Sequence, residues 1–409
     1  MKTNKLWTRN FTIITLGTVV SMLGSSISGF AISLLVLDYT GSVLLYALFM
    51  VAYNLPRIIL PMVAGPYLDN FSRTKVIYSL DFLSAALFTV MYLVIGSGYF
   101  NYPIFLVVTI FIGSIDSIYQ VAYESLYPML VSEGNFTKAY SISSLLYPFA
   151  PMMVPVAAIV YNTIGLAPLF LANAISFLIA AIFETQIRVD ESQIARKRER
   201  VSFSFLRDEF KHGMDYIRSE PGLMVITGYF FVTTLTGSAS STLWLPYFQS
   251  VPALGALMYS YVSACNVAGR LVGGIVHYRF KYPTNKKFAI ALFVYAVISL
   301  LDGGALYMPV GIMMLLFFLS GCLAVTSYNI RLSTTQSYVP NEFRGRFNGT
   351  FQMFCTFGSI IGQLIAGALG DHVPIRPLVV VFAVINIIAV FAIVYRKREH
   401  VKLIYNRDV

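Results

Sequence analysis

The stretch GPYLDNFSRTK, residues 65–75, connects one long apolar run to the next, and the rest of the chain can be arranged around it. A connection this short between two membrane-spanning segments must turn at the water boundary. It offers Gly65 where helices can approach closely, the acid Asp69 near the membrane surface, and the bases Arg73 and Lys75. The bases by themselves could simply set the membrane topology. The spacing of glycine, acid and bases in one loop favours a gating role instead.

Composition places the chain in a membrane. Of its 409 residues, 57% are hydrophobic and only 12% are charged, against about 25% charged in an ordinary soluble domain. The mean hydropathy is +0.71. The net charge of +10 indicates an anionic inner membrane leaflet and no nucleic-acid partner, because the bases lie in short loops between apolar runs. The three cysteines have neither zinc spacing nor a disulfide pattern.

Hydropathy predicts an all-helical membrane protein. A helix that crosses the lipid bilayer needs about 20 mostly apolar residues, and the sequence contains twelve such runs. The predicted spans are residues 11–37, 43–68, 76–96, 103–127, 139–161, 166–183, 223–245, 254–278, 288–307, 310–334, 345–369 and 377–395. The ninth span is the weakest, because Asp302, Gly303 and Gly304 could already form its outer turn.

The distribution of basic residues predicts the orientation. If the amino terminus is inside, nearly all of the 29 lysines and arginines fall in cytoplasmic segments. Arg376 then lies in an outer loop, and Arg57 and Arg270 lie within spans. Because positive charge accumulates on the cytoplasmic side, we expect both termini to be cytoplasmic and the number of spans to be even.

The longest break between apolar runs divides the chain into six spans and six spans. The predicted domains are an amino-terminal six-helix bundle (residues 1–187), a cytoplasmic central loop (188–222) and a carboxy-terminal six-helix bundle (223–409). Apolar residues recur in the loop at roughly helical spacing, which predicts an amphipathic helix on the inner membrane face. These residues are Phe203, Phe205, Leu206, Phe210, Met214 and Ile217.

The two groups of spans look like repeats of one unit. Gly65 and Gly274 each close the second span of a half, and Lys138 and Arg346 each open the fifth. Internal repeats of this kind are common in transporters. The expected fold is therefore an all-α membrane protein with twelve transmembrane helices in two pseudo-symmetric six-helix bundles.

Polar residues gather on the first, fourth, seventh and tenth spans, whereas the sixth and twelfth are almost wholly apolar and are predicted to face lipid. Small hydroxylated residues also let helices pack closely, which accounts for part of this pattern. Their recurrence on the same helix of each three-helix unit favours a shared central cavity. Ser241 of the seventh span and Asn329 and Arg331 of the tenth are candidates for lining it.

The fourth span carries the sharpest polar pattern. Asp116, Gln120 and Glu124 are spaced four apart and share one helix face, with Tyr119 and Tyr123 in a stripe beside them. An acid near the bilayer centre costs about 2.5–3.5 kcal/mol and must be paired, hydrated or protonated. Both acids of this span are therefore candidates for carrying a coupling proton. The glutamine, the two tyrosines and the aspartate are candidates for substrate contact.

Two arginines occupy the second spans of the two halves, each shortly after an asparagine. The pairs are Asn54 with Arg57, and Asn266 with Arg270. Substrate contact, pairing with an acid and, for Arg270, snorkelling to the membrane surface are the alternatives. A fixed ion pair between Arg57 and Asp116 is also the alternative to proton coupling at Asp116.

No constellation for enzyme chemistry is present. The four histidines lie in loops or at the ends of spans, so neither a metal site nor a histidine relay is expected. The phosphate-binding pattern GxxxxGK[S/T] does not occur, which argues against an ATP-driven pump. We expect a monomeric protein that is not an enzyme, needs no cofactor and acts on a small-molecule substrate.

The loop at residues 65–75 resembles the loop signature of the major facilitator superfamily, within it most closely the drug-exporter branch that includes bacterial macrolide efflux proteins. The segment VPNEFRGR, residues 339–346, is similar to the loop before the eleventh span of drug exporters. The resemblance covers nearly the whole chain. It implies two six-helix domains that rock around a central site in the inner or plasma membrane of a bacterium.

The resemblance also implies specific gating contacts. In the inward-closed state, Asp69 would lie at the start of the eleventh helix near Arg344 and Arg346, where a helix amino terminus favours an acid. Arg73 would reach an acid at the inner end of the fourth helix, for which Glu124 is the candidate. The chain departs from many proton-coupled relatives, which carry an arginine in the fourth helix and a glycine-proline-glycine signature in the fifth.

The function that the resemblance implies is secondary active transport by alternating access, exporting hydrophobic or amphiphilic compounds against proton entry. The alternative within the same fold is a dedicated transporter of a single metabolite, siderophore or lipid. A membrane-embedded enzyme would need a metal or nucleophile constellation, and a channel would more often use oligomeric symmetry than an internal repeat.

Overall fold

The computed structural model describes residues 5–58, 60, 71–132, 135, 139, 142, 150–189, 203–279 and 282–407. Within these residues every regular element is a helix. The chain divides into two compact units. The first comprises Met1–Gly41 and Ala52–Val201, and the second comprises Ser42–Val51 and Ser202–Val409.

Nine helices of the described residues are long and apolar enough to cross a membrane. They involve α1 (Arg9–Thr40), α4 (Arg73–Gly96), α5 (Tyr102–Leu130), α8 (Ala167–Glu184), α10 (Pro221–Ser250), α12 (Lys287–Ala305), α13 (Val310–Tyr338), α14 (Asn341–Gly370) and α15 (Ile375–Ala389). The predicted all-helical membrane class is therefore confirmed, while the count of twelve stays a prediction.

The other three predicted spans are described as shorter or more polar helices. The second contains α2 (Val43–Asn54), and the fifth contains the 3₁₀ turn Ala150–Met153 followed by α7 (Val154–Ile164). The eighth is α11 (Gly255–Arg279), which is continuous but is not among the nine apolar helices. In the ninth span, the suspected outer turn at Asp302 lies inside α12.

Local chemistry fixes several helix ends. The side-chain oxygens of Thr8, Ser72 and Asn101 accept hydrogen bonds from backbone N–H groups in the first turns of α1, α4 and α5, which satisfies donors that have no partner within the helix. Gly41 ends α1 with φ 61°, a left-handed conformation that glycine adopts without strain. Helix α2 ends at Asn54, two residues before Pro56, because proline disfavours helical geometry at the residue before it.

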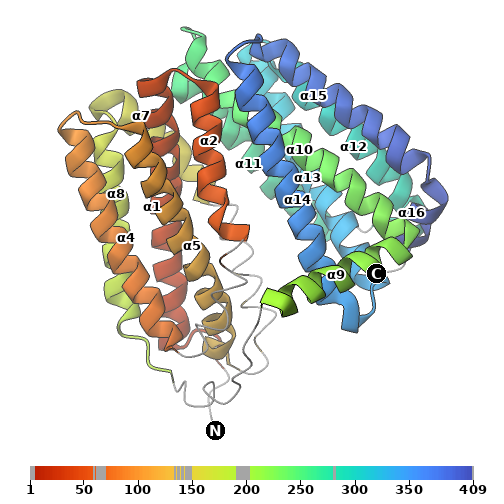
Figure 1. Ribbon diagram of the computed structural model, residues 1–409, viewed down its shortest axis with the longest axis horizontal. Helices are drawn as coiled ribbons and strands as arrows, with labels where there is room; N and C mark the ends of the chain where they lie inside the picture. The colour runs from red at the N-terminus through yellow and green to blue at the C-terminus, as the bar shows by residue number, and fades with distance from the viewer. Residues whose placement is uncertain are drawn as a thin grey trace. The chain divides into compact units, whose positions relative to one another are not determined.

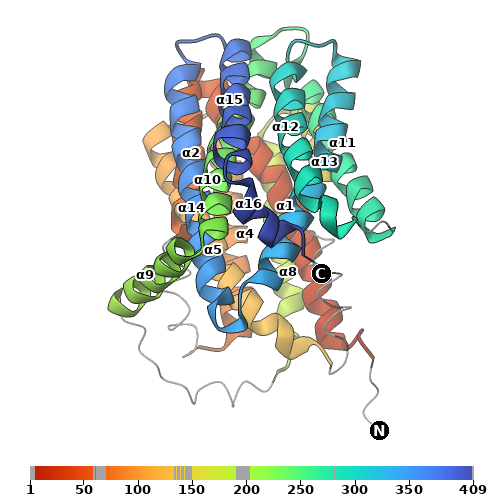
Figure 2. The same ribbon diagram turned by 90° about the vertical axis from the view of Figure 1, so that its right-hand side faces the viewer.

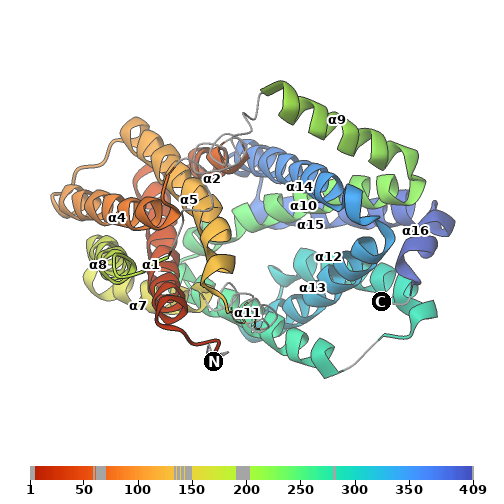
Figure 3. The same cartoon turned by 90° about the horizontal axis from the view of Figure 1, so that it is seen from below.

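In the first unit, α8 packs along both α1 and α4, and α4 also packs on α5 (Figure 1, Figure 3). Its core includes Phe11 and Ile14 of α1, Ile77 of α4 and Leu126 of α5. The opposite faces carry exposed large apolar side chains, such as Val90 of α4. Such apolar exterior is the surface that a lipid bilayer covers.

In the second unit, the same spans pair in the same way. Helix α15 packs along α10 and α12, and α13 packs on α11 and α12 (Figure 2). The sixth and twelfth spans thus have matching neighbours: α8 contacts the first and third spans, as α15 contacts the seventh and ninth. This correspondence of helix pairs supports the internal repeat that the sequence suggested.

The predicted amphipathic helix of the central loop is α9 (Phe203–Ser219). It contacts α10 and α14 and crosses the end of α14 obliquely (Figure 1). The ring of Tyr216 stacks on that of Phe343 with centroids 4.6 Å apart, and Ile217 is 2% exposed within the core of the second unit. At least this carboxy-terminal part of α9 therefore packs on protein.

The sixth and twelfth spans have exposed apolar outer faces, as the sequence predicted, with side chains such as Ile182 of α8 and Ile388 of α15. Each span also has a polar inner face that was not predicted. Asn173 of α8 is fully buried, and its Nδ2 donates to Ser28 Oγ of α1 at 2.6 Å. Asn386 of α15 donates to Ser299 Oγ of α12 at 2.8 Å and accepts from Thr233 Oγ1 of α10 at 3.0 Å. These hydrogen bonds join α8 and α15 to their neighbouring helices. The two asparagines point inward because an asparagine that faces lipid would lack hydrogen-bond partners.

Candidate functional site

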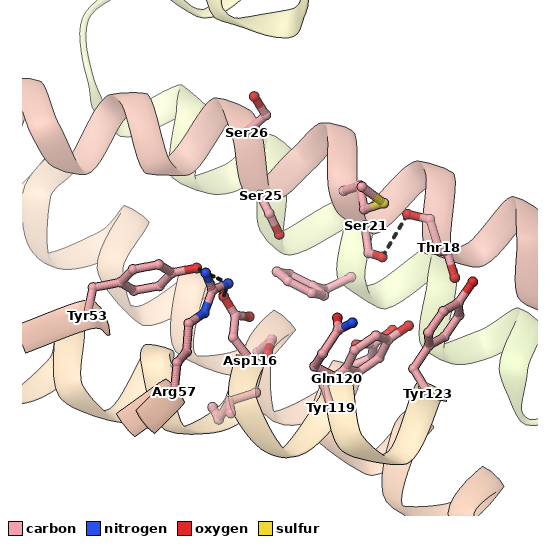
Figure 4. Close-up of a pocket in the computed structure, with 15 residues that line it drawn as sticks. Thr18, Ser21, Ser25, Ser26, Tyr53, Arg57, Asp116, Tyr119, Gln120 and Tyr123 are labelled. Atoms are coloured by element: carbon pink, nitrogen blue, oxygen red, sulfur yellow. Dashed lines mark hydrogen bonds and ion pairs between the residues drawn. The ribbon is translucent and has the colours of Figure 1, made fainter. Parts of the chain in front are cut away.

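A cavity of about 320 Å³ lies within the first unit (Figure 4). Its walls come from α1, from α2 and the residues just after it, and from α4, α5 and α8. The lining combines hydroxyl groups and charged groups with aromatic and aliphatic surface. Residues that carry the argument below are Ser21, Ser25, Tyr53, Arg57, Asp81, Asp116, Tyr119, Gln120 and Tyr123.

Helix α1 supplies a hydroxylated stripe. Thr18, Ser21 and Ser25 follow the spacing that places residues on one face of a helix, and all three line the cavity. Ser21 Oγ donates to the backbone oxygen of Thr18 at 3.2 Å, so its own hydrogen-bonding need is met within the helix. Figure 4 shows Ser21 and Ser25 facing the polar residues of α5. The stripe makes this side of the cavity polar and uncharged.

Opposite this stripe, three side chains form a connected charged group. Tyr53 Oη donates a short hydrogen bond to Asp116 Oδ2, and Arg57 Nη2 lies 3.6 Å from the same carboxylate oxygen. Arg57 Nη2 also donates to Tyr53 Oη at 3.1 Å, and its guanidinium carbon lies 4.8 Å from the centroid of the tyrosine ring. The acid, the base and the phenol point toward one another in Figure 4. The charges of Asp116 and Arg57 therefore compensate each other.

A glycine brings this group together. A Cβ atom on Gly113 of α5 would overlap the backbone oxygen of Tyr53, so only glycine allows the two segments to approach this closely. Asp116, three residues further along α5, is thereby held against Tyr53 and Arg57. The sequence predicted the pairing of Arg57 with Asp116 as one of two alternatives, but Tyr53 was not singled out.

The remaining cavity residues of α5 form the predicted aromatic stripe. Tyr119 and Tyr123 stack with ring centroids 6.2 Å apart, and Gln120 Nε2 donates to Glu124 Oε1 at 2.6 Å. Glu124 itself is exposed. Stacked rings beside an amide give a surface that can contact both apolar and polar parts of a ligand.

Two acids near the cavity are not among the candidates predicted from the sequence. Asp81 of α4 is 1% exposed and lines the cavity, and Glu184 of α8 is fully buried. Tyr119 Oη donates to Glu184 Oε1 at 3.3 Å. The signal that marks them is the presence of a carboxylate in or at the end of an otherwise apolar span. What sequence did not reveal is that these two acids lie together.

In the second unit, the candidate residues form separate small groups. Arg270 Nε donates to Asn266 Oδ1 at 3.1 Å, and Asn266 Nδ2 donates to the backbone oxygen of Phe317 at 3.0 Å. The guanidinium of Arg331 lies 4.7 Å from the ring centroid of Phe351, a stabilising cation–π geometry.

Two further candidates of this unit, Ser241 and Asn329, are exposed and half-buried, respectively. Ser241 Oγ donates to the backbone oxygen of Ser238 at 3.0 Å, and Asn329 lies on α13. In the first unit, Asn54 is half-buried at the end of α2.

The predicted gate is described only in part. Gly65 and Asp69 lie outside the described residues. Arg73 Nη1 lies 3.6 Å from Met129 Sδ, and the backbone N–H of Lys75 donates to Ser72 Oγ at 3.3 Å. In the second unit, Arg344 Nε donates to the backbone oxygen of Val339 at 3.1 Å.

The last member of the predicted gate is Arg346, on α14. Its backbone oxygen lies where a Cβ atom on Gly213 of α9 would collide. The contacts that the family resemblance implies for this loop stay predictions.

Apolar helices surrounding a polar, partly charged cavity are the architecture of a membrane transport protein. Comparison with known proteins gives the family. The model of the Major Facilitator Superfamily matches residues 14–362 and 288–407, so the chain belongs to this superfamily of transporters. The resemblance found in the loops is confirmed.

Relatives and solved structures agree with this assignment. Macrolide efflux protein A of Streptococcus pyogenes is 23% identical over 379 residues, covering 90% of this chain and 91% of that protein. A bacterial homologue of the iron transporter ferroportin, solved in an inward-facing state, has a TM-score of 0.70 at 16% identity, covering 99% of this chain and 100% of that one. The nucleoside transporter NupG has a TM-score of 0.67 at 12% identity, with 93% and 98% covered. The two structures establish the fold alone.

Proposed function

We propose that this protein is a secondary active transporter that exports hydrophobic or amphiphilic compounds of drug or macrolide type, driven by proton entry. The observation that carries the proposal is the mixed lining of the cavity. Hydroxyl groups of α1 face stacked tyrosines of α5, and the charges of Arg57 and Asp116 compensate each other at its edge. An amphiphile would place its apolar part on the rings and its polar groups among the hydroxyls.

The relationship to a macrolide efflux protein over 90% of the chain supports the substrate class. The cavity volume of about 320 Å³ lies at the lower end of the range for drug-sized ligands. The first unit alone would therefore contact one part of a large substrate. Transport would proceed by alternating access, in which ligand and proton shift the populations of two states of the protein.

The remaining elements of the proposal follow the sequence. The protein would act as a monomer in the bacterial plasma or inner membrane with both termini in the cytoplasm. Residues 1–187 and 223–409 would form the two bundles. The loop with Gly65, Asp69, Arg73 and Lys75, together with Arg344 and Arg346, would close the cytoplasmic side in one state. Asp69→Ala would then leave assembly intact and slow turnover, because one end state loses a contact; a fully active variant contradicts the gating role.

A transport assay tests the central proposal. Purified protein in proteoliposomes is given radiolabelled erythromycin and an imposed pH gradient, and nigericin, which collapses the gradient, is the control. The expected result is erythromycin movement opposite to proton flow that stops with nigericin. Movement of the drug in the direction of the proton, or no dependence on the gradient, contradicts proton-driven export.

A dedicated metabolite transporter is the second candidate, because the protein shares its fold with a nucleoside transporter and a homologue of an iron transporter. The same liposomes are therefore also assayed with labelled uridine and with ferrous iron. Saturable transport of one of these, unaffected by excess erythromycin, would favour the dedicated transporter.

A further inference from the structure

Two acids from different helices meet inside the first unit. Asp81 belongs to α4 and Glu184 ends α8, the two helices that pack most extensively in this unit. Their exposed fractions are 1% and 0%, and their carboxyl groups interact directly with each other. Acids this deeply buried require a specific compensation for their charge.

In the described part of the chain, the groups that contact the two acids are neutral or negative. From α5, Tyr119 Oη donates to Glu184 Oε1, and Asp116 adds a further negative charge that acts on Asp81. From α1, Gly17 lies so close that a Cβ atom there would stand 3.1 Å from Glu184 Oε1. Among the described residues no lysine or arginine pairs with either carboxyl group, because the nearby Arg57 is engaged by Asp116.

The hydrogen bonds of the two carboxyl groups are also incomplete. Asp81 Oδ2 and Glu184 Oε2 are both buried and have no donor among the described residues. Two ionised carboxylates can only accept hydrogen bonds, so they cannot satisfy each other. A single proton changes this, because one carboxyl group then donates to the other and one negative charge is removed.

The site borders the cavity of the first unit. Asp81 lines the cavity together with Ser84 of the same helix and Tyr119, whereas Glu184 lies behind it. A proton or a substrate that enters the cavity therefore meets Asp81 first.

We propose that Asp81 and Glu184 together form one proton-binding site that opens into the cavity and carries the coupling proton, a role that sequence had assigned to Asp116 or Glu124. This rests on the proposed proton-driven export. A proton from water in the cavity binds the pair in one state of the cycle and returns to water on the other side of the membrane in another. Asp116 is held by Arg57 and Tyr53, and Glu124 is exposed and bonded by Gln120.

Infrared spectroscopy tests the proton site without requiring transport. In the wild-type protein, a protonated-carboxyl C=O stretching band should be present near neutral pH and disappear as the pH rises. Asp81→Asn and Glu184→Gln should each abolish the band near neutral pH, because the introduced amide donates to the remaining carboxylate. Glu399→Gln is the matched control, since Glu399 is an exposed acid of α16 (Arg398–Tyr405) paired with Lys402.

Each infrared result either supports or overturns the proposed proton site. Loss of the band in both variants but not in the control supports the site. Absence of the band in wild type, its persistence in both variants, or its loss in the control overturns the proposal. If neither variant folds, wild-type protein is treated with dicyclohexylcarbodiimide, which modifies protonated carboxyl groups in apolar surroundings. Mass spectrometry should find pH-dependent modification at Asp81 or Glu184, and modification confined to other acids overturns the proposal.

Transport by the same variants then links the site to coupling. Asp81→Asn should retain exchange of labelled for unlabelled erythromycin across liposomes without a gradient, and lose accumulation driven by a pH gradient. Retained gradient-driven accumulation would separate the proton site from coupling and overturn this part of the proposal. If wild type does not move erythromycin at all, the proposed export fails, while the infrared band still decides whether the proton site exists.

Discussion

The second spans of the two halves each contain an arginine, and the two arginines have different partners. In each half, an arginine hydrogen-bonds the side chain four residues before it: Arg57 bonds Tyr53 and Arg270 bonds Asn266. In the first half an acid, Asp116, completes the group. In the second half, Asn266 instead bonds the backbone oxygen of Phe317. The acid on α12 nearest in effect to Arg270 is Asp302, whose charge acts on the guanidinium. A shared backbone arrangement therefore carries a directly bonded arginine, tyrosine and aspartate in one half, and an arginine bonded to an amide in the other.

The close helix approach behind both arrangements is the same. Gly113 of α5 meets the backbone oxygen of Tyr53, and Gly321 of α13 meets the backbone oxygen of Asn266. The comparison teaches that the repeat preserves the glycine contact that sets the helix spacing, while the side chains mounted on it diverge. The group of Tyr53, Arg57 and Asp116 lines the cavity, which is why we expect transport to be more sensitive to changes in the first half.

Arg57→Ala should have the largest effect. It leaves the Asp116 carboxylate, whose side chain is 25% exposed, without its cation, and removing a partner from a partly buried charged group costs about 1–3 kcal/mol. We expect erythromycin transport in proteoliposomes to be lost and the apparent melting temperature to fall. Arg270→Ala is the matched comparison and should reduce erythromycin transport less, because Arg270 does not line the cavity of the first unit. A larger loss with Arg270→Ala would reverse the ranking of the two halves.

Gly113→Ala should be next, and Gly321→Ala should match it. In both variants a methyl group meets a backbone oxygen that cannot move without shifting its helix, and such overpacking costs about 1–3 kcal/mol. The melting temperature in detergent measures the effect. Gly228→Ala is the control, because a Cβ atom there meets nothing within 4 Å. If only one of the two glycines is sensitive, the shared contact is not the basis of the repeat.

Replacing Asn173 of the sixth span or Asn386 of the twelfth should lower the melting temperature less than the glycine variants do, and by different amounts. Among the described residues, Asn173 bonds Ser28 of one other helix, whereas Asn386 bonds Ser299 of α12 and Thr233 of α10. Interhelical hydrogen bonds in membranes contribute about 0.6 kcal/mol each on average. Asn386→Ala should therefore lower the melting temperature more than Asn173→Ala. Equal or opposite effects would show that the count of these bonds does not set the stability of the walls.

Ser241→Ala should have the smallest effect. Its hydroxyl is exposed and donates only to the backbone of its own helix, and surface changes of this kind usually alter stability by less than about 0.5 kcal/mol. Thermal stability should be unchanged, and erythromycin transport should remain close to wild type. Strong loss of transport with normal stability would place Ser241 in substrate contact. It would also show that the second half contributes more to substrate binding than we expect.

Much of the architecture follows from local sequence. Nine of the predicted spans are helices long and apolar enough to cross a membrane. Such spans can be predicted because mean hydropathy over about 20 residues depends on those residues alone and not on the helices packed against them. The helix ends at Thr8, Gly41 and before Pro56 also follow from nearby residues. The grouping of Asp116, Gln120 and the two tyrosines on one face of α5 follows from helical periodicity.

The partners of these residues were harder to predict. Asp116 and Tyr53 lie 63 positions apart, and their contact depends on Gly113 allowing α2 and α5 to approach. Asp81 is an acid in an otherwise apolar span, which the sequence shows, but nothing in the sequence places Glu184 beside it. The sixth span was predicted to face lipid because it is almost wholly apolar. That its one asparagine, Asn173, points inward to Ser28 is set by the rotation of α8.

The sequence by itself determined that this chain is a helical membrane protein of a transporter family, because hydropathy and short loop motifs are carried by residues close together along the chain. The tertiary structure alone decided which polar groups share an environment: Tyr53 and Arg57 with Asp116, and Asp81 with Glu184. The reason is that burial and charge compensation depend on helix rotation and separation, which are set by contacts between distant segments.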